Sequence, residues 1–135
     1  MIYTIGYQRL VIEELSRVMD KLKPVLIDVR SNPKGKYNNF RGTSLSRMFP
    51  SYEYHGDTLG GRTPIKDEGI AYLGQFYRNK HKHCLLLCME HEPAECHRHL
   101  SITLPYFPEA IHIYDGDLYT SSSIDSDSPS SSGSL

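Results

Sequence analysis

The sequence predicts a single α/β domain built around a mainly parallel sheet. Short apolar runs alternate with segments whose apolar residues recur at helical spacing, and this order favours parallel strands joined by helices. The chain has 135 residues, which is long enough to bury one hydrophobic core and too short for two domains of ordinary size. Its hydrophobic content of 39% is that of a folded globular protein.

The first three predicted elements are a strand, a helix and a second strand. Residues 2–5 form a short apolar run that stops at Gly6, and apolar residues between 11 and 22 follow a helical period. Pro24 ends this helix, and residues 25–29 form a second apolar run. A helix between two short strands predicts a right-handed βαβ unit with parallel pairing.

Later segments continue the same alternation. Residues 70–77 carry an apolar stripe at helical spacing. The run 84–89 is the most apolar of the chain, as expected for a central strand buried on both faces. Pro93 suits the first turn of a helix that Pro105 would stop, and residues 110–114 form the last predicted strand. Two smaller elements are expected, a helix near 44–48 and an extended piece at 52–55.

The C-terminal tail differs from the rest in composition. Residues 120–135 are rich in serine and too polar to offset the entropy cost of ordering, so we expect a disordered tail after a domain that spans 1–119. The longest apolar run is far shorter than the roughly 20 residues of a membrane-spanning helix. The strand pattern starts at residue 2 without a signal peptide. We therefore expect a cytoplasmic protein with no membrane partner.

Net charge and cysteine content narrow the chemistry. The formal net charge is −1, so overall charge predicts no binding to polyanions. The three cysteines are an odd number in a chain without an export signal, so reactive thiols or metal ligands are better expectations than disulfides. They are Cys84, Cys88 and Cys96.

The ends of the predicted strands bring candidate functional groups together. In open α/β sheets, ligands bind beyond the carboxyl ends of the parallel strands. The first strand ends at Gly6, the second delivers Asp28 and Arg30, and the central strand delivers Cys88 and Glu90. The start of the following helix would add a positive dipole end at the same edge. We therefore expect the functional site there.

The densest group of candidates is the segment 88–98, CMEHEPAECHR. A thiolate near a helix start and cationic neighbours becomes a nucleophile or a metal ligand, whereas a free cysteine is often only a small buried hydrophobic residue. Four zinc-type ligands occur within residues 88–99, but their spacing straddles a strand end and a helix, where four side chains seldom reach one tetrahedron. We therefore expect no metal and no cofactor. The four are Cys88, His91, Cys96 and His99.

Two further motifs are basic. The loop from Arg30 to Arg47 interleaves basic and aromatic side chains, which favours contact with phosphates and bases. The adjacent Gly60 and Gly61 permit close backbone approach, and Arg62 after them can present a planar fork to a phosphate or carboxylate. Basic loops and glycine turns are also common on plain protein surfaces, so each motif alone has a neutral interpretation.

Taken together, these motifs resemble the DUF488 family, whose name records that its function is largely uncharacterised. The matching segments occur in the family's order and cover residues 3 to about 114. They are Tyr3-Thr4-Ile5-Gly6, Leu26-Ile27-Asp28-Val29-Arg30-Ser31 with Pro33, Tyr54-His55 before Leu59-Gly60-Gly61-Arg62, and Leu87-Cys88 with Glu90 before Cys96-His97-Arg98. The resemblance implies a three-layer, Rossmann-like α/β domain whose motif residues line one pocket. The family commonly has a histidine where this chain has Tyr7.

We expect this pocket to act on a nucleotide, a nucleoside or a base in nucleic acid. Its arginines would bind phosphate or another anion, its carboxylates would act as general acid and base, and its thiols would tune the site. The catalytic candidates are Glu90, Asp28, Cys88 and Cys96. The substrate-binding candidates are Gly6, Arg30, Ser31, Tyr54, His55, Gly60, Gly61, Arg62, His97 and Arg98.

Two other functions fit the same residues. One is a non-catalytic protein that binds a nucleotide or nucleic acid, and the other is a rhodanese-like thiol transferase with its cysteine at a strand end. The second lacks the glycine-rich loop of a rhodanese, and the acidic neighbour of Cys88 would raise its pKa. The sequence fixes neither the oligomeric state nor whether the protein is an enzyme.

Overall fold

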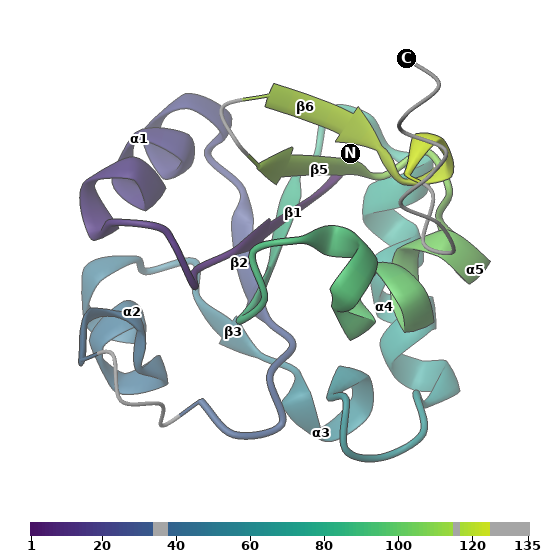
Figure 1. Cartoon of the computed structure of the whole chain (residues 1–135), viewed down its shortest axis with the longest axis horizontal. Coiled ribbons are helices and arrows are strands. Elements are labelled where there is room, and N and C mark those ends of the chain that lie inside the picture. Colours follow the sequence, from purple (N-terminus) through teal and green to yellow (C-terminus); the bar gives the residue numbers. More distant parts are fainter. Residues whose placement is uncertain (34–37, 115–116, 125–135) are drawn as a thin grey trace.

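A six-stranded, mostly parallel sheet carries the fold, in the strand order β3-β2-β4-β1-β5-β6 (Figure 1). The computed structural model describes residues 1–33, 38–114 and 117–124. Only the pairing of β5 with β6 is antiparallel. The strands are β1 (Ile2–Gly6), β2 (Val25–Asp28), β3 (Glu53–Tyr54), β4 (Cys84–Cys88), β5 (Ile111–Tyr114) and β6 (Asp117–Thr120). The predicted α/β class with a mainly parallel sheet is therefore confirmed.

Helices cover both faces of this sheet, with α1 and α2 on one side and α4 and α5 on the other (Figure 1). The helices are α1 (Ile12–Leu22), α2 (Gly42–Met48), α3 (Gly56–Leu59), α4 (Asp67–Arg78) and α5 (Leu104–Tyr106). A π-helical segment, η3 (Arg98–Thr103), leads directly into α5. Short 3-10 turns are η1 (Asn38–Phe40), η2 (Pro93–Glu95) and η4 (Ser121–Ser123). In the described residues, no helix has both the length and the apolar composition needed to cross a membrane.

The central strand β4 contributes side chains to two hydrophobic cores, one on each face of the sheet. Leu85 and Leu87 pack with residues of α1 and α2, whereas Leu86 packs with residues of α4 and η3. All five residues of β4 are buried. The prediction of a central strand buried on both faces is confirmed, and this burial fixes the strand whose end carries the candidate site.

The predicted direct pairing of the first two strands is wrong. β4 lies between β1 and β2 and pairs with both in parallel. After β2, the chain first forms β3 and α4, and only then β4, which takes the place between β1 and β2. The most apolar strand takes this position because only a central strand is covered on both faces. As a result, Gly6 lies beside Cys88, and Asp28 beside Leu87.

The helix predicted after Pro93 is interrupted. Pro93 starts the 3-10 turn η2, Cys96 is extended, and helical structure resumes only with η3. Pro105 lies inside α5 and does not stop the helix. In a regular α-helix its ring would clash with the carbonyl four residues earlier, and the wider π-helical turns of η3 before it relieve this conflict. Cys96 therefore precedes the helical segment, and Arg98 is its first residue.

The folded part of the chain extends past the predicted boundary at residue 119. Strand β6 ends at Thr120, and Ser121 is buried, with its hydroxyl 2.8 Å from Thr103 Oγ1 and 2.7 Å from His99 Nδ1. Strand β6 could not be predicted from the sequence, because all four of its residues are exposed and their order shows no apolar alternation. Residues 125–135 of the predicted tail, and the basic positions 34–37, lie outside the described residues.

Candidate functional site

The carboxyl ends of β1, β2 and β4 border one cleft of about 250 Å³, which we call the thiol cleft. The backbone pairing of β1 and β4 continues beyond the strands, because Tyr7 N–H donates to Cys88 O at 3.0 Å and Gln8 N–H to Met89 O at 2.9 Å. Half of the predicted site residues line the cleft. They are Arg30, Ser31, Gly61, Arg62, Cys88, Glu90 and His97.

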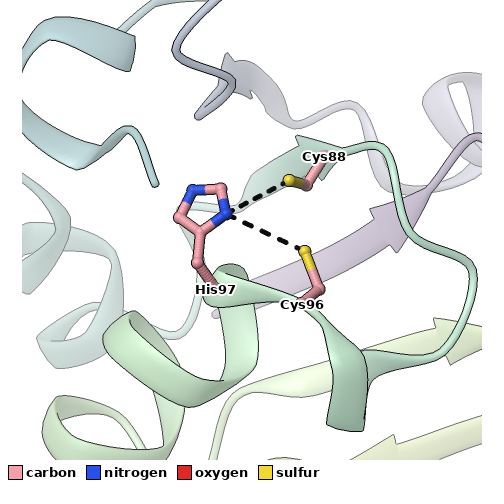
Figure 2. A group of neighbouring side chains, drawn as sticks. All are labelled: Cys88, Cys96 and His97. Atoms are coloured by element: carbon pink, nitrogen blue, oxygen red, sulfur yellow. Dashed lines mark hydrogen bonds between the residues drawn. The ribbon is translucent and has the colours of Figure 1, made fainter. Parts of the chain in front are cut away.

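Two thiols and one imidazole meet at the end of β4 (Figure 2). Of these three side chains, Cys88 and His97 line the cleft. His97 Nδ1 lies 3.4 Å from Cys88 Sγ and 4.0 Å from Cys96 Sγ. Cys88 ends β4 and is 4% exposed, and Cys96 precedes the helix and is 1% exposed. Sequence reasoning placed both cysteines at this edge and His97 among the substrate-binding candidates, but it did not foresee the contact of the His97 ring with the two sulfurs.

The orientation of the His97 ring is fixed by the far side of the site. His97 Nε2 lies 2.9 Å from Val29 O and 3.0 Å from Leu59 O. Carbonyl oxygens only accept hydrogen bonds, so Nε2 carries a proton and Nδ1 is the atom presented to the sulfurs. A Cβ at Gly61 would lie 3.1 Å from the ring, so a larger residue at this position would crowd His97.

The three groups also shift one another's protonation. A hydrogen bond from the Cys88 thiol, helped by His97 and by the positive charge of Arg98, lowers the pKa of Cys96. The same hydrogen bond, together with burial, raises the pKa of Cys88. Burial opposes a charge on His97, but its contacts with Cys96 and the two carbonyls outweigh this and raise its pKa. The cluster thus favours a thiolate on Cys96 beside a protonated imidazole, with Cys88 as a neutral thiol.

Glu90 stands beside this cluster on the loop after β4. Its Oε1 lies 3.9 Å from Cys88 Sγ. Burial, and the negative charge of Cys96 nearby, raise the pKa of Glu90. A carboxyl group with a raised pKa is suited to general acid and base work near neutral pH. The loop passes directly over Gly6, where a Cβ would lie 1.8 Å from Glu90 O, so Gly6 serves this backbone crossing and does not line the cleft.

Arg98, which we predicted to bind a ligand, is fully buried. Its guanidinium donates to Glu90 O at 2.6 Å, to His91 O at 3.3 Å and to Thr4 Oγ1 at 3.0 Å. With no exposed surface, it cannot contact a substrate in this structure. It instead holds the backbone of the loop that carries Glu90.

Asp28 and Arg30 form a buried ion pair. Arg30 Nε and Nη2 donate to the two Asp28 carboxylate oxygens at 2.8 and 2.7 Å, and the Tyr52 hydroxyl adds a bond of 2.6 Å. Asp28 is fully buried and absent from the cleft lining, so the predicted role as general base does not fit it. Arg30 does line the cleft, and within the described residues its buried Nη1 has no hydrogen-bond partner.

The glycine pair brings Arg62 to the mouth of the cleft. A Cβ at Gly60 would lie 2.3 Å from Gly56 O and 2.4 Å from Ser31 Oγ, so only glycine fits there. This packing lets Arg62 N–H donate to Ser31 Oγ at 3.0 Å. The Arg62 side chain is exposed and forms no ion pair with any described residue. Gly60 therefore serves the protein's own packing, and Arg62 remains the exposed cation at this site.

Tyr54 and His55 lie outside the cleft. The Tyr54 hydroxyl donates to Ser31 O at 2.9 Å, and Tyr54 lines a second cleft of about 700 Å³ together with Arg41. His55 Nε2 lies 3.0 Å from Glu53 Oε1, and its ring stacks on Tyr72. The predicted binding role of His55 at the thiol cleft is therefore not supported by its position.

Three residues that line the thiol cleft were not among the predicted site residues. They are Tyr7, Asn32 and Met89. Arg30 stacks on Tyr7, with Cζ 5.0 Å from the ring centre. The signal available for Tyr7 and Met89 was their place just after β1 and β4, the positions at which α/β sheets bind ligands.

The four zinc-type ligands of the 88–98 segment and its continuation do not converge. The ring of His91 packs edge-on against Tyr114, and His99 is buried 3.1 Å from His112. The ligand-type atoms that converge belong to Cys88, Cys96 and His97, all within 4.8 Å of one another. Such a group can act as a redox-active thiol pair or as a set of metal ligands.

No known protein family, curated protein or solved structure matches this chain. The resemblance to the DUF488 family therefore stays a prediction from the motifs.

Proposed function

We propose that the protein is an enzyme that acts on a nucleotide, a nucleoside or a base in nucleic acid, and that its domain is Rossmann-like and of the DUF488 type. One observation carries the proposal: a cleft at the strand ends joins titratable groups at its base to an exposed arginine at its mouth. Glu90 and His97 are the titratable groups, and Arg62 is the arginine. Ligands of α/β sheets bind at this edge.

The size of the clefts supports a ligand with two parts. A volume of about 250 Å³ is below the roughly 300 to 1,000 Å³ of typical small-molecule sites, so the thiol cleft fits one ring and not a whole nucleotide. The second cleft, of about 700 Å³, lies on the other side of the contact between Ser31 and Tyr54. A base or ribose would enter the first cleft, and the rest of the ligand would extend past Ser31 towards Arg41.

Each polar group of the thiol cleft would then have a distinct role. Arg62 would bind phosphate through its planar guanidinium. Arg30 Nη1, which has no hydrogen-bond partner among the described residues, would donate to a ligand oxygen once a side-chain movement exposes it. Glu90 would transfer a proton to or from the ring, because its raised pKa keeps a protonated fraction available at higher pH than usual.

A thermal-shift screen over nucleotides, dinucleotides and short single strands, followed by product analysis, tests this proposal. A true ligand should raise the Tm of the wild type. Arg62→Ala should weaken binding at least about 10-fold, since hydrogen bonds to charged groups contribute about 1.5 to 3 kcal/mol. Glu90→Gln should bind but turn over slowly. Arg78→Ala, an exposed arginine on α4, is the matched control and should behave as wild type.

The outcomes separate the proposal from simple binding. If a nucleotide binds but no product forms, and Glu90→Gln binds as tightly as wild type, the protein is a non-catalytic binder. If none of the compounds raises the Tm of the wild type, the nucleotide class is wrong.

Thiol transfer is the second candidate, favoured by the meeting of Cys88, Cys96 and His97. It ranks lower because a good nucleophile needs both access to the cleft and a lowered pKa, and these two properties belong to different cysteines. Cys88 lines the cleft but its pKa is raised, whereas Cys96 has the lowered pKa but is 1% exposed.

A further inference from the structure

We infer that Cys88, Cys96 and His97 form a binding site for Zn²⁺ or a similar borderline-soft divalent ion, with one coordination position open to the cleft. Their ligand atoms all lie within 4.8 Å of one another. Thiolate and imidazole together select zinc-type ions over Mg²⁺ and Ca²⁺, which prefer oxygen ligands. This inference goes beyond the proposed nucleotide chemistry and does not depend on it.

The distances suit a tetrahedral ion. With Zn–S bonds of about 2.3 Å and Zn–N bonds of about 2.0 to 2.1 Å, sulfur and nitrogen ligands of one zinc lie about 3.6 Å apart. The Sγ to Nδ1 distances to Cys88 and Cys96, 3.4 and 4.0 Å, bracket this value. An ion would therefore need only small side-chain adjustments at this site.

The ring of His97 is held as a metal ligand is held. Histidines that bind zinc almost always donate their other N–H to a carbonyl or a carboxylate. Here Nε2 lies 2.9 and 3.0 Å from the carbonyls of Val29 and Leu59, which leaves Nδ1 for the ion. The two carbonyls come from the residue after β2 and from the end of α3, so separate parts of the fold fix this orientation.

Both cysteines also stand on ordered backbone. Cys88 ends the central strand β4. The backbone N–H of Cys96 donates to Pro93 O at 3.0 Å, and its carbonyl accepts from His99 and Leu100, each at 3.0 Å. Ligands carried on fixed backbone positions need little ordering when the ion binds, which favours affinity.

The number of ligands indicates a catalytic type of site. Structural zinc sites are closed by four protein ligands, whereas catalytic ones keep three and leave a place for water or substrate. Among the described residues, the convergent group contains three. Glu90 Oε1 lies 3.9 Å from Cys88 Sγ, so a carboxyl group stands next to one of the three ligands.

Metal loading of the full chain tests this inference without any substrate. The untagged protein is reduced, stripped with a chelator, loaded with Zn²⁺ and desalted, and its zinc content is measured by mass spectrometry. We expect one tightly held zinc per chain. Loading with Co²⁺ should give the intense visible bands of a tetrahedral ion and a thiolate-to-cobalt charge-transfer band. This spectrum is read on the wild type, so it does not depend on the folding of any variant.

Variants locate the ion. Cys88→Ser, Cys96→Ser and His97→Ala should each weaken zinc binding by more than about 100-fold, because even the partners of zinc ligands contribute 10- to 100-fold. Cys84→Ala is the matched control, since this third buried cysteine lies at the other end of β4, and it should bind as wild type. Circular dichroism of each variant checks the fold.

Three results would overturn the inference: a wild type that retains no zinc, a cobalt spectrum without the thiolate band, or variants that bind as tightly as wild type. A redox pair would give a different combination of results. The protein as isolated would be two hydrogens lighter because of a Cys88–Cys96 disulfide, and after reduction it would take up no metal.

Discussion

The buried guanidinium of Arg98 donates to the backbone carbonyl of Glu90 at 2.6 Å, so the first residue of η3 sets the position of the loop after the central strand. Two further bonds, to His91 O and Thr4 Oγ1, complete this clamp. The placement of the Glu90 carboxyl beside the thiols therefore depends on an arginine that never reaches the cleft.

Arg98→Ala should be strongly destabilising. The change leaves one buried and two partly buried acceptors without this donor, and it opens a cavity where a fully buried side chain stood. Each unsatisfied buried group costs about 1 to 3 kcal/mol, so we expect the free energy of unfolding to fall by at least about 3 kcal/mol. Urea denaturation measures this loss. Arg62→Ala, at an exposed arginine, should stay within about 0.5 kcal/mol of wild type. Equal stabilities would show that the clamp is unimportant.

The Asp28–Arg30 pair should behave as a unit. Asp28→Asn leaves the buried Arg30 charge without its partner and should lower the free energy of unfolding by about 3 to 5 kcal/mol. Replacing both residues, as Asp28→Asn with Arg30→Met, should recover part of this loss, because the unpaired buried charge is then absent. A double-mutant cycle by urea denaturation gives the coupling. A double variant less stable than the sum of the two single losses would contradict a paired role.

The cysteines should react slowly in the native protein. Burial raises the pKa of Cys84, the hydrogen bond to Cys96 raises that of Cys88, and the Cys96 thiolate has little access to solvent. We expect alkylation by iodoacetamide at pH 7.5 to be at least about 10-fold slower than for free cysteine, and complete for all three thiols in urea. Peptide mass spectrometry assigns each site. Rapid native labelling of Cys88 would instead favour thiol transfer.

The sequence predicted the elements and the edge of the site better than their arrangement. Apolar periodicity identified β1, α1, β2, α4, β4 and β5, because each has a buried face that the pattern records. The direct pairing of β1 with β2 was mispredicted, because the insertion of β4 between them is a choice among parallel strands that are all apolar. The exposed strand β6 carries no such pattern and was missed.

Within the site, residue type indicated chemistry but not burial. Cys88 and Glu90 were expected at this edge because they follow a strand end, and the structure has them there. Arg98 has the same charge as Arg62, yet one is a buried clamp and the other an exposed cation, and only the tertiary structure separates them. His97 joins the thiols, where spacing alone had drawn attention to other histidines, because two distant carbonyls orient its ring.

A buried network of histidines and hydroxyls should make stability depend on pH. His112 Nδ1 bonds to the Thr4 hydroxyl, and its Nε2 lies 3.1 Å from His99 Nδ1 and 3.4 Å from Thr103 Oγ1. Burial, with the positive charge of Arg98 nearby, lowers the pKa of His112 to about 3 and also lowers that of His99. The folded protein therefore keeps His112 neutral down to a pH at which the unfolded chain has already bound a proton.

The sign of the effect follows from this difference in bound protons. Above about pH 6.5 both states are neutral at His112, and below it only the unfolded state gains a proton, so stability should fall as pH drops from about 6.5 to about 3. Each such histidine contributes at most about 1.4 kcal/mol per pH unit. Urea denaturation from pH 7 to pH 4 should show a shallower decline for His112→Gln than for wild type. His81→Gln, at an exposed histidine, should keep the wild-type slope. Parallel slopes for wild type and His112→Gln would mean that His112 is already protonated in the folded protein, contrary to its buried position.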